Sequence, residues 1–367
     1  MQLPVDLKEL LKEAADIDAA RATPLSLGIY IDATAPSDLV AHVRSSFASE
    51  HPTLRLTLSY LLDQPASAYP TDDIAIIVAG SSEVVGPSAR AIRNAGVPVM
   101  VCATQPALVE VVAAGVGAPI PLGDLVSPVK AKRTVVKDAV AFVKRIAKFE
   151  TPLQEADARG YQHAATIDTD AALEDPIALD EDTIAVFDER MAQWIASVCR
   201  TKRLAFALAF PFMRRSLAME SVSETSIQNA GVGLLPLIPG ADLPIMTANQ
   251  AKMVLQIAAA YGEPMGKERA KEIIAVMGGA FACRAIAREL IELVPVLGGV
   301  VRTGVGYFGT EAMGRAVIEY FEGGENVSGV ARVVERAAGA ANDALSQARA
   351  TVDRVRTATA AASSDSE

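Results

Sequence analysis

Apolar and polar positions in the first 120 residues follow two periods in turn, one typical of strands and one typical of helices. The short apolar runs at 74–79 and 97–102 are typical of strands buried on both faces. A compact run rich in strand-forming residues at 25–31 and an alternating segment at 53–62 predict two more strands. Helices are predicted around them at 5–20, 38–49, 88–95 and 106–114, and a further helix is predicted at 130–149. Ser37 is the candidate N-cap of the second helix, and Gly96 is expected to end the third. Strands that alternate with helices predict an α/β domain, with a mostly parallel sheet and helices packed on it.

From Phe187 onward the apolar positions repeat with the period of a helix. This part of the chain is organised around residues 230–261, where prolines and a glycine interrupt an apolar segment before a helix begins at about Ile245. The residues that share the apolar face of this helix are Ile245, Met246, Met253, Val254, Ile257 and Ala258. Gly262 and Pro264 are its expected stop signals. Two more helices, rich in small residues, are predicted at 267–292 and 304–321.

Charge divides the chain into domains. Residues 150–189 hold twelve acidic residues against one arginine, which is typical of a solvated linker. We therefore expect five segments: an α/β domain at 1–149, an acidic linker at 150–186, an all-helical domain at 187–322, an alanine-rich helix at 323–357 and a disordered tail at 358–367.

Composition narrows the class of protein. The 367 residues are 51% hydrophobic and 21% charged, which is typical of a globular protein. A net charge of −10 argues against a nucleic-acid partner, because phosphates reward basic patches. The three cysteines lie far apart without a CxxC pair, which indicates neither a disulfide framework nor a thiolate metal site. This cysteine pattern fits a reduced, cytoplasmic setting, and a peripheral position on the inner face of the cell membrane is the alternative location. The longest charge-free run, 225–241, is short for a membrane span and contains two prolines, so we expect no conventional transmembrane segment.

The strand–turn–helix at 25–49 stands where a phosphate-binding loop would stand. Such a loop needs GxxxxGK[ST], because glycines let backbone amides close around phosphate and the lysine supplies charge. The turn at 32–37 has no glycine and no lysine, and Asp38 would repel a phosphate. Residues 63–66 are similar to a GTPase D-x-P-G motif without its glycine, and 103–106 stand where a guanine-reading N-K-x-D would follow. The layout resembles an Era-like GTPase domain with decayed nucleotide motifs, and an unrelated Rossmann-like domain is the alternative.

A second glycine pattern lies near the C-terminus. Gly304, Gly306 and Gly309 spell GxGxxG, which binds a dinucleotide when it follows a strand in a βαβ unit. Arg302 precedes the motif, and the chain after Phe321 is helical without a returning strand. Close helix–helix packing through small residues is therefore the favoured interpretation.

Candidate metal ligands and reactive groups are isolated. They comprise three histidines, one acidic run and one thiol: His42, His51 and His163; Asp168, Asp170 and Glu174; and Cys283. We expect ordinary surface histidines, because no ligand pattern surrounds them. The acidic run fails the calcium-loop pattern, since Ala172 and Leu173 replace a ligand and the glycine. The thiol is expected to be structural. The sequence thus names no catalytic residue, cofactor or metal ligand.

The helix at 267–292 carries one narrow polar stripe, Arg284, Arg288 and Glu292, on an otherwise apolar surface. Such a helix is either central to a soluble bundle or in contact with another apolar surface. The bundle is favoured, and peripheral membrane contact or insertion as a short hairpin is the alternative.

Residues 234–322 resemble the YcjF-type family of bacterial domains. The shared motifs are P-L-I-P-G-A-D at 236–242, A-A-A-Y-G-E-P at 258–264, a V-P-V-L-G-G turn at 294–299 and an E-Y-F end at 319–321. The motif residues expected to have structural roles are Pro239, Gly240, Asp242, Tyr261, Gly262, Gly298 and Gly299. The resemblance implies an Era-like GTPase domain before this region and an association with membranes, and it implies no catalytic residue.

The function expected from these observations is non-enzymatic. The leading hypothesis is a membrane-associated or scaffold protein with a pseudo-GTPase domain and a helical YcjF-like domain. One alternative is a nucleotide-binding switch with a non-standard site, and another is a soluble interaction or dimerisation protein. The expected partners are a membrane surface, a protein or a second copy of the chain, but not a nucleic acid.

Overall fold

The computed structural model describes residues 7–62, 64–67, 69–128, 175–234, 242–266 and 298–323. The chain divides into two compact units. One unit holds residues 20–217 and contains the sheet, and the other holds residues 1–19 together with 218–367. The expected helix at 130–149, the alanine-rich helix, the tail, the helix at 267–292 and most of the acidic linker lie outside the described residues.

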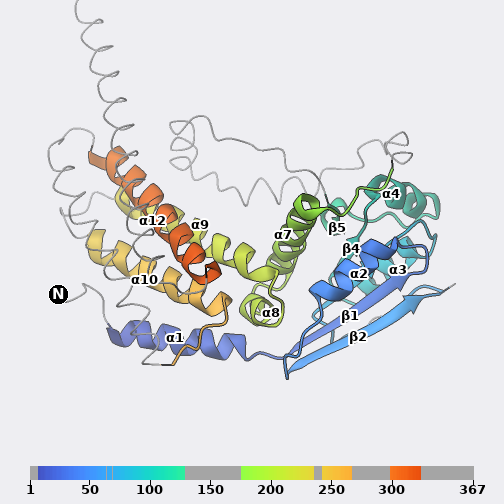
Figure 1. The fold of residues 1–367 in the computed structure, drawn as a ribbon, viewed down its shortest axis with the longest axis horizontal. Coiled ribbons are helices and arrows are strands. Elements are labelled where there is room, and N and C mark those ends of the chain that lie inside the picture. Colours follow the sequence, from blue (N-terminus) through green and yellow to red (C-terminus); the bar gives the residue numbers. More distant parts are fainter. Residues whose placement is uncertain are drawn as a thin grey trace, which may run out of the picture. The chain divides into compact units, whose positions relative to one another are not determined.

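The first unit is built on a five-stranded parallel sheet (Figure 1). Its strands are β1 (Leu25–Asp32), β2 (Leu54–Leu61), β3 (Ile74–Val78), β4 (Val99–Cys102) and β5 (Leu125–Val126). They pair in the order β2-β1-β3-β4-β5. This is the order of flavodoxin-like doubly wound sheets, in which helices cover both faces. The predicted α/β class is confirmed, although β5 was not predicted, because its two residues lie among prolines that indicated a loop.

Helices pack on both faces of this sheet. On one face, α3 (Val85–Asn94) and α4 (Pro106–Gly115) share a buried cluster with alternate strand residues such as Ile77 and Val101. The intervening residues, such as Ile76, point to the other face because side chains alternate along a strand. That face is covered by α2 (Ser37–Ser46), α7 (Glu181–Val198) and α8 (Arg203–Ala209). Buried contacts there include Cys102 with Met191 and Phe47 with Phe210.

Local sequence signals fix several helix ends. Asp180 caps α7 in a capping box with Thr183, each side chain accepting from the other's backbone amide. Gly96 follows α3 with φ of 83°, in the left-handed region that glycine adopts without strain, so the predicted stop is confirmed. Gly262 does the same after α10 (Asp242–Ala260), with φ of 91°. The cap of α2 is Pro36, and Ser37 is its first helical residue rather than its cap.

Every element that the structure describes in the second unit is a helix. These elements are α1 (Leu7–Arg21), α9 (Met213–Leu234), α10 and α12 (Gly298–Glu322), with the unit boundaries falling inside α1 and α9. A buried polar network joins three of them, in which Asn229 and Gln250 both donate to the Thr310 hydroxyl, over 2.9 and 2.8 Å. None of the described helices is both long and apolar enough to cross a membrane.

The structure differs from expectation in four places. The helices α7 and α8 belong to the unit of the sheet, and α1 belongs to the helical unit, so the division at residues 149 and 187 is not the observed one. The α10 helix begins at Asp242, since Pro244 in its first turn needs no amide donor. Gly298 and Gly299 are the first residues of α12 rather than a turn. Ile245 is 45% exposed, whereas the other residues of the predicted apolar face are buried.

Candidate functional site

Ligands of doubly wound sheets bind outside the carboxyl ends of the strands, at the point where the strand order reverses. Here that point lies between β1 and β3. The segments that meet there are the turn after β1, which begins at Asp32, and residues 79–82 after β3. This switch point is the first place to look for a binding site.

The Asp32 carboxylate fills the switch point. Its Oδ2 atom accepts the backbone amide of Gly80 over 2.9 Å and that of Ser82 over 3.3 Å. The same atom accepts the Thr34 hydroxyl over 2.8 Å, and Oδ1 accepts the Thr34 amide over 3.2 Å. Asp32 is buried, with 2% of its surface exposed. Converging backbone amides of this kind bind anions in other proteins, and in this chain they bind a side chain of the protein itself.

The two loops of the switch point touch each other directly. The Ser81 amide donates to the Thr34 hydroxyl over 2.8 Å. A Cβ atom placed on Gly80 would lie 2.3 Å from the backbone carbonyl carbon of Thr34, so only glycine fits. Because backbone meets backbone here, a phosphate cannot enter between the loops without moving them apart.

The other two positions expected for nucleotide motifs are also tied into the protein. The amide of Ala66, which stands where a switch glycine would stand, donates to the buried Ser88 hydroxyl over 3.0 Å. Thr104, at the end of β4, is buried, and its carbonyl accepts the amide of Ile177 over 2.9 Å. Burial also raises the pKa of the adjacent Cys102 thiol, which keeps it neutral. These groups therefore serve the packing of the unit.

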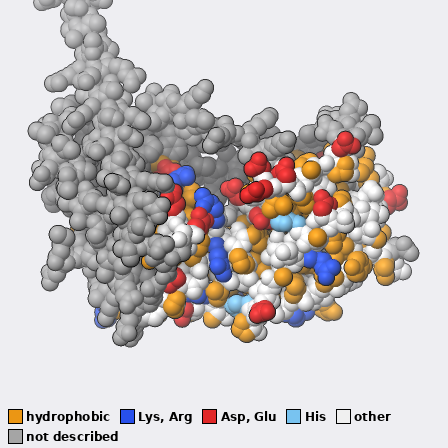
Figure 2. Space-filling model, in the orientation of Figure 1, with side chains coloured by type: hydrophobic (Ala, Val, Ile, Leu, Met, Phe, Trp, Pro, Cys, Tyr) orange, Lys and Arg blue, Asp and Glu red, His pale blue; other side chains and the backbone are white. Residues whose placement is uncertain are grey.

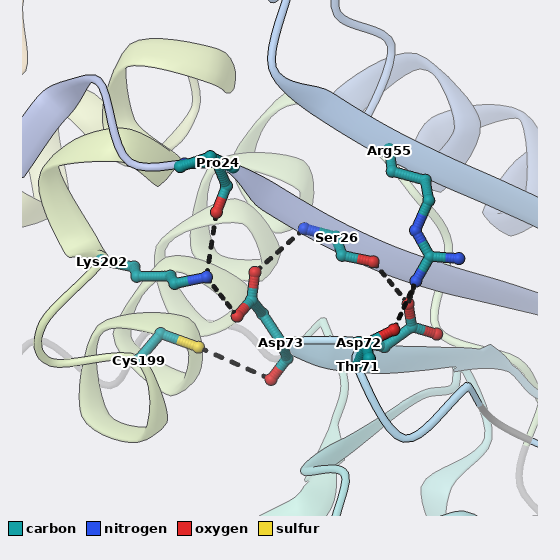
Figure 3. Close-up of polar contacts among 8 residues, drawn as sticks. All are labelled: Pro24, Ser26, Arg55, Thr71, Asp72, Asp73, Cys199 and Lys202. Carbon is teal, nitrogen blue, oxygen red and sulfur yellow. Dashed lines mark hydrogen bonds and ion pairs between the residues drawn. The ribbon is translucent and has the colours of Figure 1, made fainter.

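A second polar group gathers at the opposite, amino end of the sheet (Figure 3). It comprises Ser26, Arg55, Asp72, Asp73 and Lys202, which we call the amino-end cluster. Lys202 donates to Asp73 over 2.6 Å and to the carbonyl of Pro24 over 2.9 Å, and Asp73 accepts the Ser26 amide over 2.9 Å. Most of these residues line a surface pocket of about 310 Å³.

Charges in the amino-end cluster are paired one to one. Asp72 is completely buried and accepts from Arg55 and from the Ser26 hydroxyl, both over 2.6 Å. Asp73 is neutralised by Lys202 in the same way. The nearby Cys199 thiol is also unreactive, because burial and the Asp73 carboxylate raise its pKa to about 12. The pocket thus offers an ionic ligand little net charge, and the cluster ties the loop before α8 to the start of β3.

The structure places the remaining candidate residues as follows. His42 is not an ordinary surface histidine, since it pairs with Asp188 of α7 over 2.8 Å and lies against the Phe187 ring. His51 is held near the surface by the Thr53 hydroxyl over 3.2 Å. His163, Cys283 and the acidic run at 168–174 lie outside the described residues. Within the described ranges no group of three or more metal-binding side chains gathers.

The glycine-rich motif near the C-terminus is part of a helix. Gly304, Gly306 and Gly309 all lie within α12, which begins at Gly298, so the motif follows a helical turn and not the end of a strand. A Cβ on Gly306 would lie 2.7 Å from the carbonyl oxygen of Asn229, so the backbones of α12 and α9 nearly touch. The predicted packing role is confirmed for Gly306.

The family-motif residues divide between described and undescribed parts. Tyr261 stacks on Phe321 with ring centroids 5.7 Å apart, and its hydroxyl donates to Glu322 over 2.7 Å. Gly262 ends α10, and Asp242 begins it. Pro239 and Gly240 lie outside the described residues. The described motif residues therefore lie at helix ends or in contacts between helices.

Sequence reasoning missed the partners of Asp32 and the whole amino-end cluster. An aspartate directly after a buried strand was visible, and so was the Asp72-Asp73 pair directly before one. Their partners were not, because Gly80 lies 48 residues from Asp32, and Lys202 lies 129 residues from Asp73. Comparisons with protein-family models, with curated proteins and with solved structures gave no match to this chain.

Proposed function

We propose that this chain is a non-enzymatic scaffold protein. Its sheet-containing unit is a GTPase-like or related doubly wound unit whose nucleotide position is filled from within, and its helical unit is a YcjF-like domain. The observation that carries the proposal is the Asp32 carboxylate, which takes up the converging amides of Gly80 and Ser82. An enzyme or a switch of this fold class would need those amides for its ligand.

Two further observations support this proposal. The thiols of Cys102 and Cys199 have raised pKa values, so neither supplies a thiolate nucleophile. Charged side chains of both signs are interspersed with hydrophobic ones on the described surface that Figure 2 shows. Together with the net charge of −10, such a surface suits contacts with other proteins better than attraction to anionic lipid or nucleic acid.

A nucleotide titration of the full chain tests the proposal. Purified protein is titrated with GTP and with ATP in the presence of Mg²⁺, and binding is followed by calorimetry. We expect no saturable heat, because binding would have to expel the Asp32 carboxylate and separate the two loops. Saturable binding that is lost in Ser81→Glu, a change in the exposed loop of the switch point, but kept in Ser45→Glu on α2, would establish the nucleotide-switch alternative instead.

Flotation with vesicles distinguishes a scaffold that binds other proteins from one that binds a membrane surface. The full chain is mixed with vesicles of neutral and of anionic lipid and centrifuged through a density gradient. We expect it to stay with the soluble fraction. If the chain floats, the proposed target is a membrane surface and not a protein partner.

A further inference from the structure

The outer edge of β2 has no partner strand among the described residues. β2 pairs with β1 along its whole length, from Leu25 opposite Leu54 to Asp32 opposite Leu61, and it stands at the end of the sheet order (Figure 1). A strand in this position presents a row of free backbone donors and acceptors, and the group that satisfies them is another extended strand.

One face of β2 is also apolar and exposed. Its residues and their exposed fractions are Leu56 39%, Leu58 41%, Tyr60 59% and, directly after the strand, Leu62 74%. The residues that pair with the first three in β1 are Leu27, Ile29 and Ile31, and all three are almost completely buried. The covering helices thus protect the apolar face as far as β1 and leave it open on β2.

The segment lacks the features that usually protect an exposed edge. Residues 54–62 contain no proline and no lysine, and the one charge is Arg55. Arg55 is directed away from the apolar row, because it pairs with Asp72 and lies over the Tyr69 ring, 5.0 Å from its centroid. A long, apolar and unprotected edge strand is expected either to aggregate or to be covered in the working protein.

We propose that β2 pairs antiparallel with β2 of a second copy of this chain, so that the two sheets become continuous. A two-fold axis perpendicular to the sheet at Leu58 keeps the apolar faces on one side. It sets Leu58 opposite Leu58 of the second copy, Leu56 opposite Tyr60, and Leu54 opposite Leu62. Arg55 then faces Leu61 of the second copy, so like charges stay apart. We infer a second copy as the partner of the β2 edge, because β2 matches another β2 strand both in its backbone hydrogen-bonding groups and in its apolar row.

This pairing names the partner of the proposed scaffold and in that respect rests on the proposed function. The two can nevertheless fail separately. The nucleotide titration reports on the switch point, whereas the state of assembly is read from molecular mass.

Light scattering coupled to gel filtration, over a series of protein concentrations, measures that mass. The wild-type chain is expected to be a dimer. Leu58→Lys should raise the dimer dissociation constant by about tenfold or more, because two lysines would lie opposite each other at the axis. The matched control is Leu122→Lys, which changes an exposed leucine, 54% accessible, away from β2 and should leave the dimer intact. Circular dichroism verifies that each variant is folded.

A cross-link tests the position of the axis. Leu58→Cys should form a disulfide-linked dimer under mild oxidation, because directly opposed residues on antiparallel strands bring their Cβ atoms close together. Leu122→Cys controls for the natural cysteines and should not cross-link. A wild-type chain that is a monomer at every concentration would overturn the proposal, whatever the result of the flotation experiment. A dimer that persists in the Leu58→Lys variant would overturn it as well.

Discussion

At the residue scale, the buried Asp32 carboxylate accepts the backbone amides that converge on the switch point. A charged oxygen away from water is tolerated only when donors surround it, and four hydrogen bonds from Thr34, Gly80 and Ser82 meet that need. The same donors would otherwise be available to an external anion. Asp32 thus stabilises the switch point and closes it at the same time.

Replacing Asp32 with asparagine should therefore destabilise the protein. The amide side chain keeps the shape but turns a donor group toward the amides that Asp32 now accepts. We expect the free energy of unfolding to fall by about 1–3 kcal/mol, measured by urea denaturation. The control is Asp38→Asn on the exposed first turn of α2, where a change of only about 0.5 kcal/mol is expected. Equal effects of the two substitutions would show that the Asp32 hydrogen bonds contribute little.

At the scale of elements, small residues decide which helices can approach closely. Gly306 of α12 lies against the backbone of Asn229 in α9, and Gly314 lies against the Val222 side chain. The sequence predicted this packing correctly from GxGxxG, because no strand stood before the motif. It could not identify the partner helix, since Asn229 and Gly306 are far apart in the chain and no local pattern links them.

Substitution of Gly306 by alanine tests this close contact. The new Cβ would overlap the Asn229 carbonyl, and we expect thermal or urea unfolding to show a loss of about 1–3 kcal/mol. Gly231 in α9 is the matched control, since a Cβ there would meet nothing within 4 Å. Gly231→Ala should stabilise the helix by about 0.5–1 kcal/mol. The contact would be refuted if both alanine variants gained stability.

At the scale of the whole molecule, the division into two units departs from what charge and composition indicated. The acidic segment was expected to separate the domains, yet α7 and α8, which follow it, complete the unit of the sheet. Their apolar residues, such as Phe187 and Phe206, are fully buried within that unit. Helices that follow an acidic segment can therefore pack with the domain that precedes it, because their apolar surface decides what they pack against.

A fragment of residues 20–217 should consequently fold by itself. The strands and the helices on both faces share their core within this range, so the fragment should show helix and strand by circular dichroism and one cooperative urea transition. The shorter fragment 20–128 lacks α7 and α8 and leaves one face of the sheet open, so it should aggregate or unfold without cooperativity. A non-cooperative longer fragment would show that the unit depends on the rest of the chain.

The sequence alone determined the local features of this protein. Short apolar runs defined β1, β3 and β4, and glycines at 96 and 262 defined helix ends, because each signal acts within a few residues. The sequence also shows that the turn at 32–37 lacks the glycines and the lysine of a phosphate-binding loop. Tertiary structure alone decided that Asp32 meets Gly80, that Lys202 meets Asp73, and that the apolar row of β2 stays exposed. These features depend on which strands become neighbours and where the covering helices end. Such contacts join distant residues, and no local period of the sequence records them.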